Sequence, residues 1–311
     1  MVFTMSDEAD REIIQDLSHA LLQDAIVKDN DPVQVDLAIR LGANVLQPIA
    51  FGTIKTSRGE VRGSAQPLVA AVGRKDINEE IVRLLIDAGA DVNAYEYGIS
   101  PPLYHVVYYN YVDLARLLIQ HGADVNFQDR AGKTPLAYAS AIGNRDMVAL
   151  LLSSRADPNL SSNKGETPLL LSLRSDKLEL SELLVLNGAE VNVSDVNGSS
   201  ALHLAIGKNS FRLASLMIIK GSDVNARDNS GNTPLILAAI AGNAHICKQL
   251  LNSSADPLLS DKTGKNAEQY ADMSGNPSLV ALFRAHRSAA ELKLATRSES
   301  TSLTERRKIT T

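Results

Sequence analysis

Apolar residues with helical spacing dominate the middle of the chain. Leu136 and Ala139 lie three positions apart, and Val148 and Leu151 repeat that spacing after an interruption at Gly143. Each set marks one apolar face of a short helix. The pattern predicts two antiparallel helices whose faces must be covered by neighbouring elements, because one short helix pair cannot bury them alone.

The same pattern returns every 33 residues. Three residue types mark fixed positions in the period, namely Asn93, Asn126, Asn159, Asn192 and Asn225, then Gly132, Gly165, Gly198, Gly231 and Gly264, then Leu103, Leu136, Leu169, Leu202 and Leu235. A period of this length over five units is typical of a repeat architecture. We therefore expect one elongated domain, in which each unit buries its apolar face against its neighbours.

Residues at the helix ends support this division. The Thr134 hydroxyl can cap a helix that starts at Pro135. The first helix should end at a left-handed residue, at Gly143 and at the equivalent positions Asn110, Asp176, Asn209 and Gly242. At the end of the second helix most repeats have Gly, but Arg155 and Ser254 take this place in two of them. A left-handed non-glycine residue costs about 1–2 kcal/mol, so these two turns are candidates for altered geometry.

The motifs Gly132-Lys133-Thr134-Pro135-Leu136 and Gly231-Asn232-Thr233-Pro234-Leu235, together with Gly-Ala-Asp-Val-Asn endings, resemble the ankyrin repeat. The resemblance covers roughly residues 20–287. It implies an all-α solenoid of helix-turn-helix units with short hairpin loops, with about seven repeats and a polar C-terminal cap.

Three segments depart from the repeat. Residues 1–19 are predicted to form an N-terminal helix with Ile13, Ile14 and Leu17 as its buried face. About 12 residues are inserted near 47–63, either as a tolerated surface loop or as a finger that contacts a partner. Residues 288–311 are rich in Ser and Thr and should form a disordered tail.

Composition narrows the environment. The net charge of −5 argues against binding nucleic acid or an anionic membrane in bulk. A single cysteine, Cys247, excludes a disulfide framework within one chain, and neither a signal peptide nor an apolar run of membrane-spanning length is present. These features predict a cytoplasmic protein, with a nuclear location also open.

Catalytic patterns are lacking. Gly132-Lys133-Thr134 matches the end of a phosphate-binding loop, but the earlier glycine that the loop needs is replaced by Phe127. The six histidines show no metal-ligand spacing, and His203 is expected to form a structural hydrogen bond between turns. We therefore predict no catalytic residues, no metal, no cofactor and no enzyme activity.

The resemblance implies that partners meet the hairpin tips and the exposed face of the first helices. Six of the eight tyrosines lie in one repeat, and four of these occupy such positions: Tyr95, Tyr97, Tyr108 and Tyr109. In the following repeats these positions hold six basic residues but only one acidic residue, Glu166. The six basic residues are Arg130, Lys133, Lys164, Arg174, Lys208 and Arg227. Packing between repeats and a solvated face are the alternatives. The preferred hypothesis is an aromatic anchor beside a basic strip that binds an extended acidic protein segment.

The sequence thus predicts a non-catalytic scaffold or adaptor, monomeric alone, that binds a protein partner. The alternative is a substrate-recognition subunit of a larger enzyme complex such as a ubiquitin ligase. That role requires a C-terminal docking box, and none is recognisable after Arg287.

Overall fold

A computed structural model describes residues 8–56, 59–95, 100–289 and 291, with side chains described from residue 13 onward except at 51–63. The chain divides into two compact units, residues 1–164 and 165–311. Each unit is a stack of short helix pairs.

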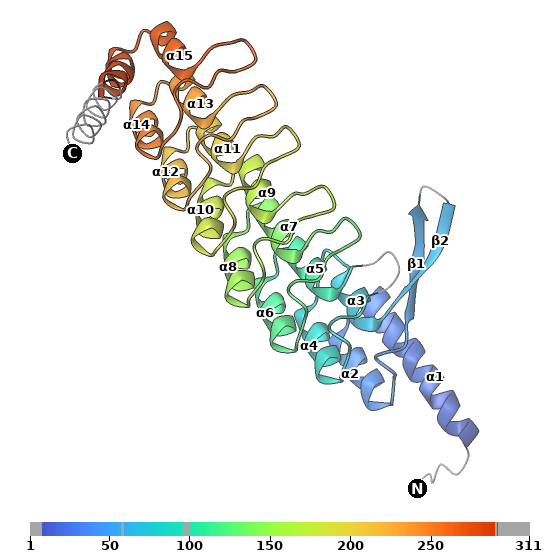
Figure 1. Cartoon of the computed structure of the whole chain (residues 1–311). Coiled ribbons are helices and arrows are strands. Elements are labelled where there is room, and N and C mark those ends of the chain that lie inside the picture. Colours follow the sequence, from blue (N-terminus) through green and yellow to red (C-terminus); the bar gives the residue numbers. More distant parts are fainter. Residues whose placement is uncertain (1–7, 57–58, 96–99, 290, 292–311) are drawn as a thin grey trace, which may run out of the picture. The chain divides into compact units, whose positions relative to one another are not determined.

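The first unit holds four helix pairs. Within it, Figure 1 shows α3, α5 and α7 in one row and α4, α6 and α8 in a second row. Its helices are α1 (Glu8–Asp24), the π-helical turn η1 (Ala25–Asp29), α2 (Pro32–Arg40), α3 (Pro67–Val72), α4 (Glu79–Asp87), α5 (Pro102–Tyr108), α6 (Val112–Gln120), α7 (Pro135–Ile142) and α8 (Arg145–Ser153).

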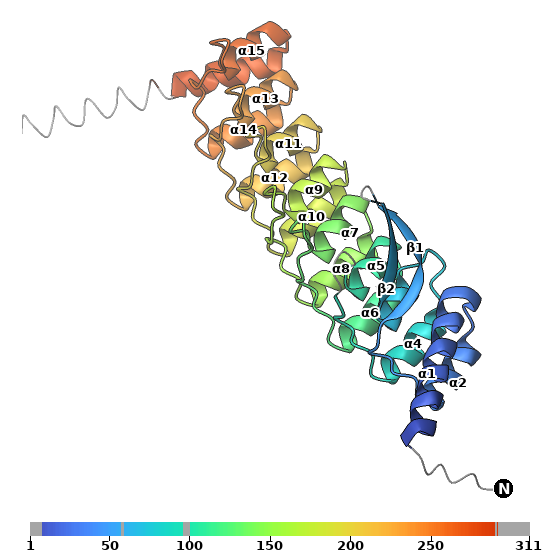
Figure 2. The same ribbon diagram turned by 90° about the vertical axis from the view of Figure 1, so that its right-hand side faces the viewer.

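The insertion between the first two repeats forms an antiparallel β-hairpin. Strand β1 (Ile49–Thr56) pairs with β2 (Gly59–Ala65), from Ile49 opposite Ala65 to Thr56 opposite Gly59, with an irregularity at Phe51/Thr53. Figure 2 shows the two strands side by side. The buried residues Ile49 and Ala65 form the base of the hairpin, and β1 packs against α1 and α3.

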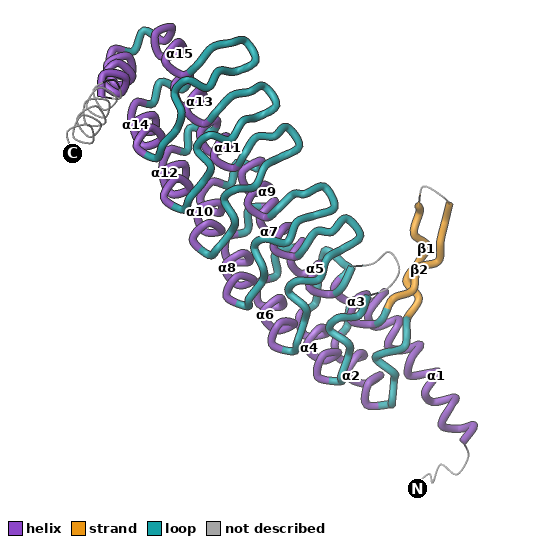
Figure 3. Tube along the Cα trace, viewed as in Figure 1, coloured by secondary structure: helices purple, strands orange, loops and turns teal. Residues whose placement is uncertain are grey.

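The second unit repeats the same design. Its helices are α9 (Pro168–Arg174), α10 (Leu178–Leu186), α11 (Ala201–Gly207), α12 (Phe211–Ile219), α13 (Pro234–Ile240), α14 (Ala244–Asn252) and α15 (Ala267–Ser274), followed by a helix over residues 277–289. In this unit the loops before α11, α13 and α15 project to the same side of the helices (Figure 3).

The predicted helix ends are confirmed. Thr134 accepts a hydrogen bond from the Ala137 N–H, and Pro135 is the first residue of α7. The first helices are followed by left-handed residues at all five predicted positions: Asn110, Gly143, Asp176, Asn209 and Gly242. The first helix of each of these repeats therefore ends at the same position of the 33-residue period.

Arg155 and Ser254 are also left-handed, with φ of 66° and 68°. The turn that follows nevertheless keeps the hydrogen bonds of the other repeats. The Asn126 amide reaches the Arg155 carbonyl at 3.4 Å, as the Asn93 amide reaches the Gly122 carbonyl at 2.9 Å. The non-glycine residues therefore strain the end of the helix without removing the turn.

The predicted buried face of the first helix is wrong. Ile13, Ile14 and Leu17 are exposed, whereas Leu22 and Ala25, further along the same chain segment, are fully buried. Helix α1 continues to Asp24, beyond the expected limit at residue 19, and the buried residues among its described side chains are Ser18 and Leu22. The expected tail at 288–311 lies almost wholly outside the described residues, and its predicted disorder stays a prediction.

Candidate partner-binding surface

Repeat three presents a tyrosine at the end of its first helix. Helix α5 starts at Pro102 and ends at Tyr108, because Tyr109 and the left-handed Asn110 turn the chain away. The Tyr108 side chain is 61% exposed, and its ring lies 5.1 Å from the Tyr109 ring in an edge-to-face arrangement. The partly exposed Tyr109 thus supports Tyr108 from one side.

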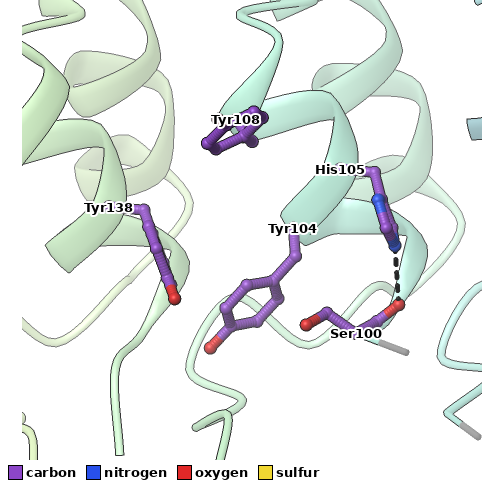
Figure 4. A pocket seen from close by; sticks show the side chains of 5 residues that line it. All are labelled: Ser100, Tyr104, His105, Tyr108 and Tyr138. Carbon is purple, nitrogen blue, oxygen red and sulfur yellow. Dashed lines mark hydrogen bonds between the residues drawn. The ribbon is translucent and has the colours of Figure 1, made fainter. Parts of the chain in front are cut away.

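A cavity of about 220 Å³ opens beside Tyr108. Its lining residues are Ser100, Tyr104, His105, Tyr108 and Tyr138 (Figure 4). The Tyr104 ring from α5 and the Tyr138 ring from α7 meet edge to face at 5.5 Å, and Tyr104 itself is buried. Two adjacent repeats therefore build one aromatic hollow in the first unit.

The hydroxyl groups of this hollow are already engaged. Tyr104 donates toward the carbonyls of Phe127 and Lys133, and its oxygen accepts from the Asp129 N–H at 3.0 Å. Tyr138 donates to the Asp129 carboxylate at 2.8 Å. The hollow consequently offers ring faces and edges to a partner side chain, and these hydrogen bonds hold the rings in place.

Burial controls the charge state of the hollow. It raises the pKa of Tyr104, and together with the hydrogen bond to Asp129 it raises the pKa of Tyr138 to about 12. It lowers the pKa of His105, whose Nε2 lies 3.1 Å from the Ser100 carbonyl. The three groups are neutral at pH 7, which suits the binding of an apolar side chain.

The other predicted tyrosines differ in their surroundings. Tyr95 is partly exposed and its ring lies 5.2 Å from that of Phe127. Tyr97 lies outside the described residues. Tyr111 donates to the Lys75 carbonyl at 3.2 Å, so it links repeats two and three.

The predicted basic residues do not form one uniform strip. In the first unit Arg130 and Lys164 are exposed, while the Lys133 ammonium lies 5.6 Å from the centre of the Tyr138 ring. The other three basic residues lie in the second unit, and each has a partner there. Arg174 pairs with Glu166, and Lys208 pairs with Asp176 at 3.0 Å. Arg227 donates to the Ser260 carbonyl at 2.6 Å. Part of the positive charge in the second unit is thus already offset.

Sequence reasoning missed two apolar residues of the second unit. Ile240, the last residue of α13, is 53% exposed, and Met273 near the end of α15 is 66% exposed. Helices α13 and α15 are neighbours. Both residues occupy the repeat position of Tyr108, since 108, 141, 174, 207, 240 and 273 are 33 apart. Following that single position along the chain would have found them.

Metal binding or catalysis in the described part of the chain would use groups of His, Cys, Asp and Glu, the thiol of Cys247, or His203. No group of three or more His, Cys, Asp or Glu side chains there could hold a metal ion. Cys247 is buried, and burial raises the pKa of its thiol to about 12. His203 bonds the Asn232 carbonyl of the next repeat at 3.0 Å, as the sequence predicted. Among the described helices, none combines the length and apolar character that crossing a membrane requires.

Comparison with known proteins agrees with this architecture. The family model for ankyrin repeats matches in three copies, over residues 68–162, 142–228 and 202–293. These matches span most of the sequence, so the chain belongs to the ankyrin-repeat family.

Among solved structures, one match is a chain of the complex described as the predatory endopeptidase Bd0816 from Bdellovibrio bacteriovorus with the immunity protein Bd3460. It is 28% identical, with a TM-score of 0.49, and the match covers 58% of this chain and 96% of that chain. No curated protein matches the chain significantly.

Proposed function

We propose that this chain is a non-catalytic scaffold or adaptor that binds a segment of a protein partner at the ends of its first helices. Each unit has its own first-helix surface made of these ends, marked by Tyr108 in the first unit and by Arg174, Lys208, Ile240 and Met273 in the second. The ankyrin-repeat family membership supports a protein partner rather than a small substrate.

One observation carries the proposal, the exposed Tyr108 beside an aromatic hollow. A tyrosine buries a large ring at low entropic cost, and such residues are common energetic centres of interfaces. The cavity of about 220 Å³ admits one apolar or aromatic side chain of a partner. The walls are fixed before binding by the Tyr104 and Tyr138 hydrogen bonds, which reduces the ordering cost.

The proposal also includes a preference of this chain for an acidic partner segment. In the first unit the exposed Arg130 and Lys164 support it. In the second unit, Arg174 and Lys208 would have to exchange Glu166 and Asp176 for partner carboxylates, which yields little net energy at an exposed site. We propose that an acidic part of the partner lies near the exposed Lys164 in the first unit, and that Ile240 and Met273 offer an apolar contact within the second unit.

A cytoplasmic location, with the nucleus also open, is part of the same proposal. The lone buried thiol of Cys247 is compatible with a reducing compartment.

Affinity capture from the native cell extract tests the function. Tagged wild-type protein, Tyr108→Ala and the control Ile219→Ala are compared by quantitative mass spectrometry; Ile219 is an exposed apolar residue at the end of a second helix. A partner should be recovered about tenfold less with Tyr108→Ala and equally with the control. Equal recovery by all three proteins, with unchanged thermal stability, would contradict the proposal.

A further inference from the structure

Helix α1, helix α2 and Leu41, the residue that follows α2, expose apolar side chains in the first unit. We call this set the N-terminal face; its members are Ile13, Ile14, Leu17, Val33, Leu37 and Leu41. Leu17 is 66% exposed and Leu37 is 48% exposed, and α1 packs on α2. Terminal repeats of such arrays normally have a polar outer side.

The repeat pattern identifies what Leu37 faces. Its equivalents in the first unit are Leu84, Leu117 and Leu150, and in the described structure all three are less exposed than Leu37. In the second unit, Gln249 at this same position receives a 2.7 Å hydrogen bond from Ser215 of the preceding repeat. The position therefore points to the preceding repeat, and Leu37 is exposed because no described element lies there.

The last described helix differs. Its exposed residues over 277–289 are only Pro, Ser, Ala and Arg, while Leu279 and Phe283 are buried and Val280 and Leu282 are half-buried. The exposed residues of this helix therefore offer no large aliphatic or aromatic side chain that could cover the N-terminal face of another copy head to tail.

The charge around the N-terminal face points to one kind of partner. Residues 13–40, whose side chains the structure describes, contain five carboxylates and two cations, a net charge of −3. Both of these cations are already paired, Lys28 with Asp24 at 2.9 Å and Arg40 with Asp36 at 2.8 Å. A second copy placed face to face would bring two acidic surfaces together, which is unfavourable.

We propose that the N-terminal face docks a basic amphipathic helix of a protein partner, in the place that a preceding repeat would occupy. Leu17, Leu37 and their apolar neighbours receive the apolar stripe of that helix, and its Lys and Arg side chains meet the surrounding carboxylates. This second docking surface is separate from the first-helix surface and prefers the opposite charge.

The probe is a labelled synthetic peptide of about 18 residues with Leu at i, i+3, i+4 and i+7 and Lys elsewhere. Two control peptides carry Glu in place of Lys, or the same composition in scrambled order. Fluorescence anisotropy with the full chain should show binding about tenfold or more tighter for the amphipathic Lys peptide than for either control. Binding should weaken between about 50 mM and 300 mM salt.

Variants locate the site. The double change Leu17→Asp with Leu37→Asp should reduce peptide affinity about tenfold or more, whereas Leu258→Asp, at an exposed leucine of the second unit, and Tyr108→Ala should not. Circular dichroism melting checks that the variants fold. Equal binding of the three peptides, or unchanged affinity of the folded double variant, would overturn the proposal. Light scattering that shows a dimer lost in the double variant would also overturn it, in favour of a second copy.

Discussion

The side-chain oxygen of Asn126 accepts a 2.8 Å hydrogen bond from the backbone N–H of Asp157, 31 residues further along the chain. The amide nitrogen of the same side chain donates to the Arg155 carbonyl of that later repeat. In the second unit Asn192 makes the equivalent pair of bonds to Asp223 and Gly221. One asparagine in each of these turns thus joins its repeat to the next, which explains why the residue recurs every 33 positions.

Replacing this asparagine should weaken the stack. Asn126→Ala removes two hydrogen bonds between repeats and should lower the free energy of unfolding by about 1–3 kcal/mol. Urea denaturation followed by circular dichroism measures the change. Gln47→Ala, at an exposed residue, serves as control and should have little effect. Equal stability of the two variants would show that the asparagine bonds do not hold the repeats together.

Relieving a strained helix end should stabilise the protein. Arg155→Gly places glycine at φ of 66° and should raise the unfolding free energy by about 1 kcal/mol. Ala149→Gly, at an exposed position in the middle of α8, should instead lower it by about 0.5–1 kcal/mol. Loss of stability in Arg155→Gly would mean that the arginine side chain contributes more than its backbone costs.

The hydroxyl of Tyr104 should matter for stability rather than for direct contact with a partner. Tyr104→Phe keeps the ring but removes the bonds that join α5 to the loop around Asp129, so it should cost about 1 kcal/mol. Thermal melting checks this. Because the rings of the hollow remain, partner capture should fall far less than with Tyr108→Ala; a larger loss with Tyr104→Phe would place the hydroxyl at the interface.

Stability should fall on acidification below pH 6.5. Burial lowers the pKa of His203 in the folded state, and its Nδ1 accepts from the Ser200 N–H, so the native protein favours the neutral ring. The unfolded chain takes up the proton near pH 6.5, so the stability present above this pH is lost as the pH falls toward the lower folded value. Melting temperatures from pH 7.5 to 5 measure the slope. It should be shallower in His203→Gln but unchanged in His245→Gln, at an exposed histidine. Equal slopes would contradict this role for His203.

The repeat period made most of the fold predictable. Caps such as Thr134 and left-handed residues such as Asn110 act locally, so they can be recognised without tertiary information. The hairpin at 49–65 was expected only as an insertion, because its strands pair with each other and share no pattern with the repeats. The apolar spacing of Ile13 and Leu17 indicated a helix face correctly but could not show whether an element covers it.

The candidate surface was predictable in part. The cluster of tyrosines was visible in the sequence, and the structure separates the buried Tyr104 from the exposed Tyr108 by their places on α5. Arg174, at the end of α9, pairs with Glu166, which precedes that helix by two residues. Sequence spacing alone does not specify this ion pair. The residues predicted to bind a partner therefore remain a prediction that needs a direct contact measurement.

The most direct measurement places a photo-crosslinking benzoylphenylalanine at position 108 and, in a second protein, at position 219. Ile219 is also exposed but belongs to a second helix, away from the first-helix surface. After irradiation with the captured partner, we expect a crosslinked product from position 108 and none from position 219. A product from position 219 alone would contradict this expectation.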